Sequence, residues 1–240
     1  MKEVNFWFEE QGWRPQPFQK ACWKAYGQGQ NGMLHAPTGS GKTYALWGGI
    51  VAEAKKEQSL KKATYALWIT PLRALAVEIQ QATQRMNDAL LPATKVALRT
   101  GDTSQNLRAK QKRDPSFGLV TTPESLHVLL STKEHQTYFK QLRIVVIDEW
   151  HELLGTKRGV QVELALAYLR SFIPKLRVWG ISATLGNQEL ARTTLLGATE
   201  NYSVINAKIS KNIRVKSVLP KTMERFPWRG HLGLHLLPQV

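Results

Sequence analysis

The sequence predicts an α/β protein whose mostly parallel sheet has helices on both faces. Strand-like and helix-like segments alternate along the chain, which is the rhythm of βαβ units. Residues 143–147 and 177–181 are continuously apolar or nearly so, as expected for strands that are buried on both faces. A Gly-rich turn follows the short strand-like segment 32–35, and a helix-like segment comes directly after it.

The individual elements follow from this alternation. We expect strands at residues 32–35, 64–70, 95–99, 118–121, 143–147 and 177–181, with weaker ones at 202–206 and 213–219. We expect helices at residues 18–28, 43–56, 72–90, 107–113, 124–130 and 160–172. From residue 220 the chain carries Pro, Gly, Trp and basic residues and is typical of a linker.

Composition and charge narrow the class of protein. The 240 residues are 42% hydrophobic and 21% charged, so the chain can bury a substantial core. The net charge of +15 favours a polyanionic partner, either nucleic acid or an anionic membrane surface. No apolar run approaches the roughly 18 residues of a membrane-spanning helix. The single cysteine, Cys22, excludes an internal disulfide, and a reducing cytoplasmic compartment is the default.

The strongest motif spans residues 36–43 and has the pattern of a phosphate-binding loop between a strand and a helix. Its glycines let backbone N–H groups turn toward phosphates, and the helix N-terminus attracts an anion. Lys42 is then expected to reach the β- and γ-phosphates, and the Thr43 hydroxyl to bind Mg²⁺. The residues expected to cradle the nucleotide are Thr38, Gly39, Ser40, Gly41, Lys42 and Thr43. The alternative is a Gly-rich turn with a chance lysine.

A second motif is the run Asp148-Glu149-Trp150-His151, directly after the buried strand 143–147. Asp148 is placed to hold Mg²⁺ opposite the phosphate loop, and Glu149 to orient and deprotonate an attacking water. The alternative is an ordinary acidic strand end. A third motif, Ser182-Ala183-Thr184, ends the next apolar strand and gains meaning only from its order after the first two.

Together these motifs resemble those of superfamily 2 helicases of the DExH-box type. Residues 148–161 resemble more narrowly the Lhr-type (large helicase-related) enzymes, and specifically the bacterial ligase-associated DEXH-box helicases. The resemblance implies a RecA-like P-loop NTPase fold, ATP and Mg²⁺ as cofactors, and ATP hydrolysis coupled to movement on nucleic acid. It also implies that His151 acts with Ser182, Ala183 and Thr184 to couple the nucleotide site to a second motor domain.

The resemblance assigns further binding residues. Gln19 matches the motif that binds adenine, with Phe6, Trp7 or Phe8 expected to stack nearby. Three β–α turns match the nucleic-acid-binding motifs, although plain turns also carry Pro, Gly and Thr. Their candidate residues are Pro71 and Arg73, then Thr100, Gly101 and Asp102, then Thr122, Pro123 and Glu124. For Lys157 and Arg158, a solvated helix start and a nucleic-acid contact stay equally open. The basic cluster Arg108, Lys110, Lys112 and Arg113 is either a solvated face or an extra phosphate contact.

The resemblance also sets expectations for the whole chain. Residues 1–219 are expected to form the ATP-binding domain and residues 220–240 a linker toward a second RecA-like domain, which supplies arginine fingers and is absent. The expected partners are single-stranded or partly duplex DNA, with RNA not excluded, and a DNA ligase and nucleases of DNA repair. The expected location is the cytoplasm, at the bacterial nucleoid. The alternatives are a basic nucleic-acid-binding module with a vestigial ATPase, and a P-loop kinase or transferase, for which the sequence shows no arginine-bearing lid.

Overall fold

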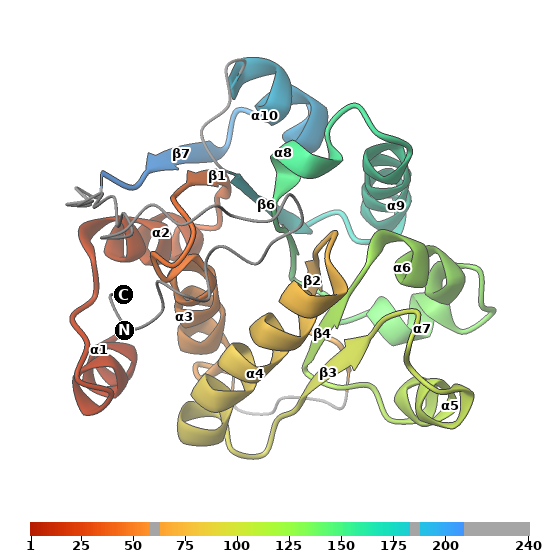
Figure 1. The fold of residues 1–240 in the computed structure, drawn as a ribbon, viewed down its shortest axis with the longest axis horizontal. Helices are drawn as coiled ribbons and strands as arrows, with labels where there is room; N and C mark the ends of the chain where they lie inside the picture. The colour runs from red at the N-terminus through yellow and green to blue at the C-terminus, as the bar shows by residue number, and fades with distance from the viewer. Residues whose placement is uncertain (58–62, 183–187, 209–240) are drawn as a thin grey trace, which may run out of the picture. The chain divides into compact units, whose positions relative to one another are not determined.

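The computed structural model describes residues 1–57, 63–182 and 188–208, which lie in one compact unit, Met1–Lys208. Within these residues, seven strands form one parallel sheet in the order β3-β4-β2-β5-β6-β1-β7 (Figure 1). The strands are β1 (Asn31–His35), β2 (Ala66–Ile69), β3 (Val96–Arg99), β4 (Gly118–Thr121), β5 (Ile144–Ile147), β6 (Arg177–Ser182) and β7 (Tyr202–Asn206).

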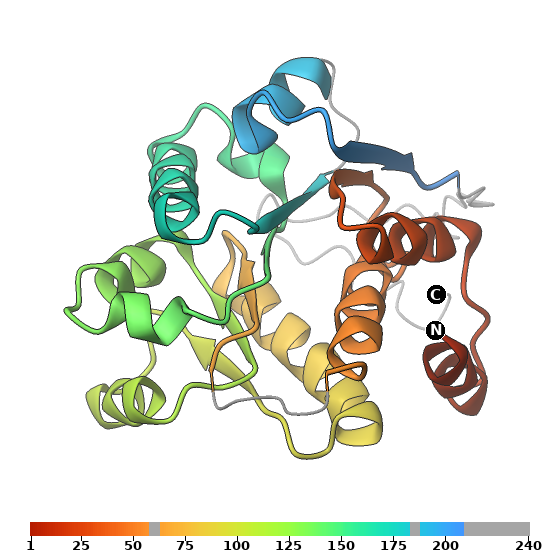
Figure 2. The same ribbon diagram turned by 180° about the vertical axis from the view of Figure 1, so that it is seen from behind.

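Helices cover both faces of this sheet, as the sequence predicted. Figures 1 and 2 show α3 and α4 on one side of the strands and α6 and α9 on the other. The helices are α1 (Lys2–Glu10), α2 (Pro17–Gly27), α3 (Lys42–Ala54), α4 (Arg73–Leu90), α5 (Gln105–Arg113), α6 (Pro123–Leu130), α7 (His135–Phe139), α8 (Trp150–Leu153), α9 (Lys157–Phe172) and α10 (Gln188–Leu196).

Two apolar layers hold the helices on the sheet, because successive side chains of a strand point to opposite faces. On one face, Leu67, Ile69 and Val145 pack against residues of α6 to α10. On the other face, Trp68 lies 6.3 Å from Trp47 of α3, measured between ring centroids. Trp47, Trp68 and Trp179 are at most 1% exposed and belong to the core.

Every strand and helix expected within the described residues is present, with ends that move by a few residues. The largest shift is at α9, which begins at Lys157 and not at residue 160. Four helices were not expected: α1, α7, α8 and α10. The strand expected at 213–219 and the linker expected at 220–240 lie outside the described residues. No helix in the described part of the chain is both long and apolar enough to cross a membrane.

The strand order places the motifs at one edge of the sheet. β1 lies between β6 and β7, while β2, the next strand in sequence, lies on the far side of β5 and β6. In a parallel sheet, a point where the strand order reverses leaves a crevice at the carboxyl ends of the strands. The phosphate loop after β1, the acids after β5 and the turns after β2, β3 and β4 therefore all open on the same edge.

Candidate functional site

The loop between β1 and α3 has the backbone of an anion cradle. Gly39 and Gly41 have φ angles of +74° and +85°, a region that side-chain-bearing residues rarely adopt. Gly41 is the N-cap of α3, so the N-terminus of that helix faces the loop. The Ser40 hydroxyl is buried without a hydrogen-bond partner in the described chain. Backbone donors at a helix N-terminus and an unused hydroxyl fit a bound phosphate group.

Residues far apart in sequence meet at this loop. Lys42 Nζ lies 2.7 Å from Glu149 Oε1, and both side chains are largely buried. The backbone N–H of Glu149 donates to Asp148 Oδ1 at 2.9 Å. Glu149 has a φ of +47°, a strained value for a residue with a side chain. The predicted phosphate-binding lysine and the predicted catalytic acids are therefore in one site.

Asp148 is 4% exposed. Burial raises its pKa to about 6, although the nearby Lys42 acts in the opposite direction. A second anion, Glu149, raises the pKa further. Such a carboxylate is more easily kept ionised when a cation lies beside it, and carboxylate and hydroxyl oxygens are the ligands that Mg²⁺ prefers. Asp148 and Thr43, which lies in the first turn of α3, thus suit the predicted Mg²⁺ site by chemistry.

His151 and Ser182 also lie at this edge. His151 Nδ1 is 3.4 Å from Glu149 Oε2, and its Nε2 is 3.5 Å from Glu152 Oε1. Ser182 is the last residue of β6, in register with His35 of β1, and its hydroxyl is buried without a hydrogen-bond partner in the described chain. Ala183 and Thr184 lie outside the described residues, so the coupling role of this motif stays a prediction.

Beside the phosphate loop is a pocket of about 420 Å³. Its lining residues are Phe8, Trp13, Arg14, Gln16, Gln19, Gly39, Ser40, Gly41 and Tyr44. Gln19 Oε1 accepts from the backbone N–H of Gln16 at 2.8 Å, and Gln19 Nε2 donates to the Gly41 carbonyl at 3.1 Å. The predicted adenine-binding residue therefore connects the N-terminal segment to the phosphate loop.

The three aromatic residues expected near adenine behave differently. Phe8 lines the pocket, Trp7 is 1% exposed and belongs to the core, and Phe6 is 60% exposed and is not among the lining residues. Sequence reasoning missed Trp13, Arg14 and Tyr44. Trp13 is 40% exposed and lies 5.6 Å from Tyr44 between ring centroids. An aromatic residue next to a cation, a few positions before Gln19, was the signal that could have found it.

A second pocket, of about 450 Å³, lies over the turns after β2, β3 and β4. It is lined by Pro71, Leu72, Arg73, Gly101, Thr122, Glu124, Ser125 and Arg158. The structure thus brings together residues of all three predicted nucleic-acid motifs. Of the other candidates, Thr100 and Pro123 are buried and do not line the pocket, and exposed Asp102 pairs with Arg73 at 2.8 Å.

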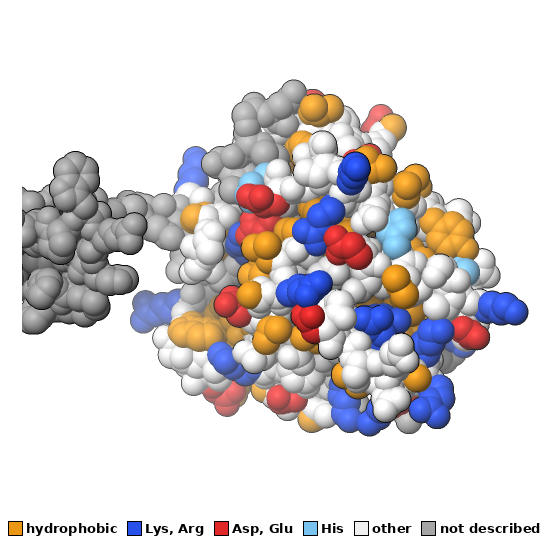
Figure 3. Space-filling model, turned by 45° about the vertical axis from the view of Figure 1, so that its right-hand side comes forward, with side chains coloured by type: hydrophobic (Ala, Val, Ile, Leu, Met, Phe, Trp, Pro, Cys, Tyr) orange, Lys and Arg blue, Asp and Glu red, His pale blue; other side chains and the backbone are white. Residues whose placement is uncertain are grey.

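The basic residues of α5 fall into two groups: Arg108 bonds to a neighbouring turn, and the others lie near the end of the helix. Arg108 donates to the carbonyls of Thr100 and Gly101 at 3.1 and 3.0 Å, so it supports one of the predicted motifs. Lys110, Lys112 and Arg113 lie in the last turn of the helix. Figure 3 shows Lys and Arg side chains gathered over the lower part of one face of the molecule, the side on which α5 lies. This surface is suited to a polyanion.

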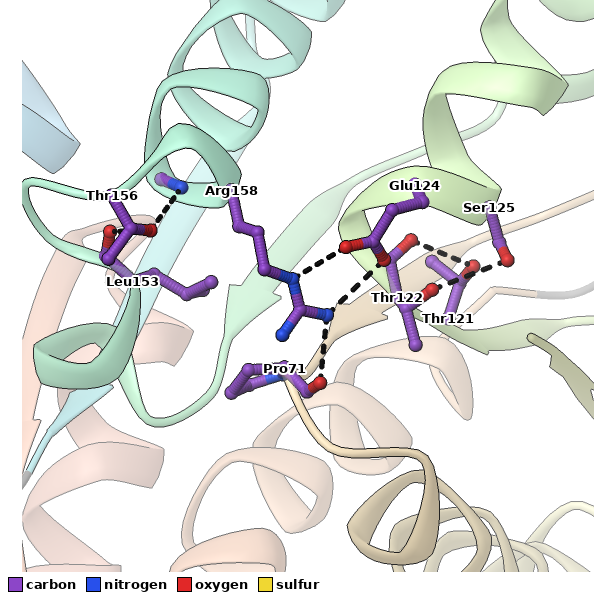
Figure 4. A network of polar contacts seen from close by, with 9 residues as sticks. Pro71, Thr121, Thr122, Glu124, Ser125, Leu153, Thr156 and Arg158 are labelled. Carbon is purple, nitrogen blue, oxygen red and sulfur yellow. Dashed lines mark hydrogen bonds and ion pairs between the residues drawn. The ribbon is translucent and has the colours of Figure 1, made fainter. Parts of the chain in front are cut away.

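Arg158 is the lining residue whose role the sequence left open. Figure 4 shows its guanidinium pointing from the start of α9 toward Glu124 and Pro71. Arg158 Nε donates to Glu124 Oε1 at 2.6 Å, and Nη2 donates to Glu124 Oε2 at 3.2 Å and to the Pro71 carbonyl at 2.8 Å. Arg158 is therefore not a freely solvated residue, and three hydrogen bonds within the protein already use its Nε and Nη2 donors.

Comparison of the sequence with known proteins shows which family this chain belongs to. A family model described as DEAD/DEAH box helicase matches residues 16–193. The chain belongs to this helicase family. The Lhr-Core ATP-dependent helicase of Saccharolobus solfataricus is 31% identical to this helicase domain over 229 residues, which is 90% of the chain and 26% of that protein. The Lhr helicase/probable uracil glycosylase of Mycolicibacterium smegmatis is 35% identical over 78% of the chain and 13% of its own length.

Solved structures agree. Mycobacterium smegmatis helicase Lhr, bound to ssDNA and AMP-PNP, superposes on this helicase domain with a TM-score of 0.72 at 28% identity, covering 87% of the chain and 28% of that protein. The DEAD-box helicase Mss116, at 19% identity and a TM-score of 0.69, shares the fold. The RecA-like fold and the resemblance to Lhr-type helicases are therefore confirmed. The chain spans about a quarter or less of the length of these curated relatives.

Proposed function

We propose that this helicase domain binds ATP and Mg²⁺ and hydrolyses ATP as the first half of a motor that moves along single-stranded DNA. The pairing of Lys42 with Glu149 carries the proposal. It joins the phosphate loop after β1 to the acids after β5, across residues that are more than a hundred positions apart. A chance lysine in a Gly-rich turn would have no reason to meet a largely buried carboxylate there.

Each residue has a distinct part in the reaction. The backbone donors of the loop and Lys42 bind the phosphates, and this binding separates Lys42 from Glu149. Glu149 then takes a proton from the attacking water, whose oxygen forms the new bond to the γ-phosphorus while the bond to the β-phosphate oxygen breaks. Thr43 and Asp148 would hold Mg²⁺, which supplies neutralising positive charge when bound. Gln19 and the aromatic pocket would hold adenine.

Nucleic acid is the proposed partner of the second pocket. The pocket joins the three predicted motifs, the net charge is +15, and the similar helicase of M. smegmatis was solved with ssDNA. Hydroxyls, backbone donors and helix N-termini of this kind bind backbone without reading bases, so RNA stays an alternative. A role in DNA repair with a ligase and nucleases, and a cytoplasmic location at the nucleoid, are proposals from family resemblance.

We also propose that full activity needs a second RecA-like domain. An arginine supplied from outside the site is worth about 10³–10⁵ in rate in related reactions. The domain alone is therefore expected to bind ATP and to hydrolyse it slowly. The proposed boundaries, residues 1–219 for the domain and 220–240 for a linker, belong to the same proposal.

The test is ATP hydrolysis with and without single-stranded DNA, for this chain and for a version extended by the second domain. Glu149→Gln removes the base while keeping size, so we expect it to lower the rate of the extended form by about 10²–10⁴ while ATP still binds. Glu78→Gln is the matched control, because it makes the same chemical change at an exposed position of α4 that lines neither pocket. Equal rates for wild type and Glu149→Gln in the extended form would favour a nucleic-acid-binding module with a vestigial ATPase.

A further inference from the structure

Arg158 has an unusual position for a cation. It lies in the first turn of α9, where the helix dipole disfavours positive charge. Its side chain is only 37% exposed, and all three of its hydrogen bonds to Glu124 and Pro71 are directed away from its own helix (Figure 4). The unfavourable helix dipole and the partial burial of the cation must be offset, and hydrogen bonds to the Glu124 carboxylate and the Pro71 carbonyl offset them.

These contacts join the starts of three helices. Pro71 comes just before α4, Glu124 is in the first turn of α6, and Arg158 is in the first turn of α9. Pro71 and Glu124 belong to two different predicted nucleic-acid motifs, on turns that follow neighbouring strands β2 and β4. A planar guanidinium that bonds both fixes the distance between the two turns.

The first turn of α9, which carries Arg158, is fixed by hydrogen bonds and by close packing. The hydroxyl of Thr156 accepts from the backbone N–H of Gly159 at 3.1 Å and donates to the Leu153 carbonyl at 2.7 Å. A Cβ atom at Gly159 would lie 2.1 Å from that carbonyl oxygen, so the first turn of α9 is pressed against the end of α8. The first turn of α9, from which Arg158 reaches the two turns, is therefore held firmly in place.

Glu124 is an unexpected group in a site for phosphates, because a free carboxylate would repel them. Burial by itself would raise its pKa, but the hydrogen bond from Arg158 and the other donors around it hold the pKa below its ordinary value. The carboxylate thus stays ionised and occupied by Arg158. Its chemistry fits a partner of Arg158 better than a ligand of nucleic acid.

We propose that Arg158 is a positioning residue for nucleic-acid binding, with Glu124 as its partner, and that this pair holds the turns at residues 70–73 and 122–125 at the spacing that a single strand requires. The inference rests on the proposed function, since it assumes that the pocket binds nucleic acid. The competing role is a direct contact of Arg158 with phosphate, in which Glu124 only weakens the cation. The two roles predict opposite effects for the loss of Glu124.

The experiment measures the affinity of the whole chain for a fluorescent single-stranded DNA oligonucleotide. The variants are Arg158→Gln, Glu124→Gln and the double variant. We expect each to weaken binding by about tenfold, and the double variant to be no worse than either, as for two groups that act through one contact. We expect Arg158→Lys to restore binding only in part, because one ammonium cannot form the same fork. Tighter binding by Glu124→Gln would overturn the proposal and support direct contact.

Matched controls are Arg192→Gln and Glu189→Gln, because Arg192 and Glu189 form a comparable ion pair on α10. They change the net charge by the same amounts and should alter affinity by less than about twofold, because neither residue lines the pocket over the three turns. A loss in Arg192→Gln as large as that in Arg158→Gln would show that total charge alone matters, and would also overturn the proposal.

Amide hydrogen exchange of the free chain gives a readout that needs no nucleic acid. In Arg158→Gln we expect faster exchange in the turns at 70–73 and 122–125 together, with the core strands unchanged. Unchanged exchange in both turns would overturn the positioning role. If the wild-type chain fails to bind the oligonucleotide, the nucleic-acid part of the proposed function fails, and exchange alone decides whether Arg158 sets the spacing of the turns.

Discussion

At the scale of single residues, Trp13 is the aromatic side chain best placed to stack on a nucleotide base. It lines the pocket beside the phosphate loop, and 40% of its surface is exposed. Stacking of a base on an aromatic ring is worth about 1–3 kcal/mol. We therefore expect Trp13→Ala to weaken ATP binding by roughly five- to 150-fold while the affinity for tripolyphosphate stays the same.

The measurement is titration calorimetry with ATP and with tripolyphosphate. Phe6→Ala is the matched control, since Phe6 is an exposed aromatic residue of the same N-terminal segment that does not line the pocket. If Phe6→Ala weakens ATP binding and Trp13→Ala does not, the original sequence expectation for Phe6 is restored and Trp13 is only a surface residue.

At the scale of secondary-structure elements, the junction of α8 and α9 has little room. We expect Gly159→Ala to destabilise the domain by about 1–3 kcal/mol, because the new Cβ would lie 2.1 Å from the Leu153 carbonyl oxygen and the helix must shift. The shift also displaces Arg158, so single-stranded DNA binding should weaken in the same variant. Urea unfolding and the oligonucleotide titration measure the two effects.

Gly27→Ala is the control for this change. Gly27 is the last residue of α2, a Cβ there meets no atom within 4 Å, and its φ is not positive. Replacing such a glycine changes stability by at most about 1 kcal/mol, usually upward, through the unfolded chain. Equal stability of the two variants would mean that α9 accommodates a side chain at Gly159 without strain.

At the scale of the whole domain, one ionic network ties together elements from both ends of the sequence. The carboxylate of Glu53 on α3 accepts from Tyr26 of α2 at 2.6 Å, from Tyr65 before β2 at 3.0 Å, and from Arg177 of β6 at 2.5 Å. Arg177 also lies 4.1 Å above the Tyr26 ring centre. Burial by itself would raise the pKa of Glu53, but these donors hold it below its ordinary value of 4.5.

The lowered pKa fixes the sign of a pH effect. The network stabilises the domain above pH 4.5, where the unfolded carboxyl is ionised, and this stabilisation is lost as the pH falls through the folded pKa. We expect Glu53→Gln to reduce the free energy of unfolding by about 1–3 kcal/mol at pH 7, a value discounted because a third of the Glu53 side chain is exposed.

Urea unfolding of wild type and Glu53→Gln at several pH values measures this difference, which should shrink below pH 4.5. The comparison between the two proteins cancels the titration of other groups, such as Asp148. A difference that stays constant down to pH 3 would mean that the network contributes through shape and not through the charge of Glu53.

The sequence predicted most of this domain because its signals are local. Apolar runs located the strands, and the spacing of the phosphate loop and the acids located Lys42, Asp148 and Glu149, which the structure brings together. The sequence did not predict the helix α1, which has only nine residues and no side-chain cap at its N-terminus. In the structure Val4, Trp7 and Phe8 form its buried face, at the spacing of one helix face.

Other features depend on contacts between distant segments. The role of Arg158 requires knowing that the turns at Pro71 and Glu124 lie side by side, which follows from the pairing of β2 with β4 and not from any local pattern. Trp13 lines the pocket beside Phe8 and Tyr44, and Tyr44 is about thirty positions away in the sequence. Residues 183–187, where the third motif continues, lie outside the described chain.

The position of β1 in the sheet has a consequence for synthesis on the ribosome. β1 pairs only with β6 and β7, the last two strands of the described chain, so about 170 further residues must be made before its neighbours are complete. At about 5–20 residues per second this takes roughly 10–35 seconds. The phosphate loop, which emerges early, has no sheet to hold it during that time. The proposed nucleotide site therefore forms late in translation, and the apolar residues of β1 lack their strand partners until then.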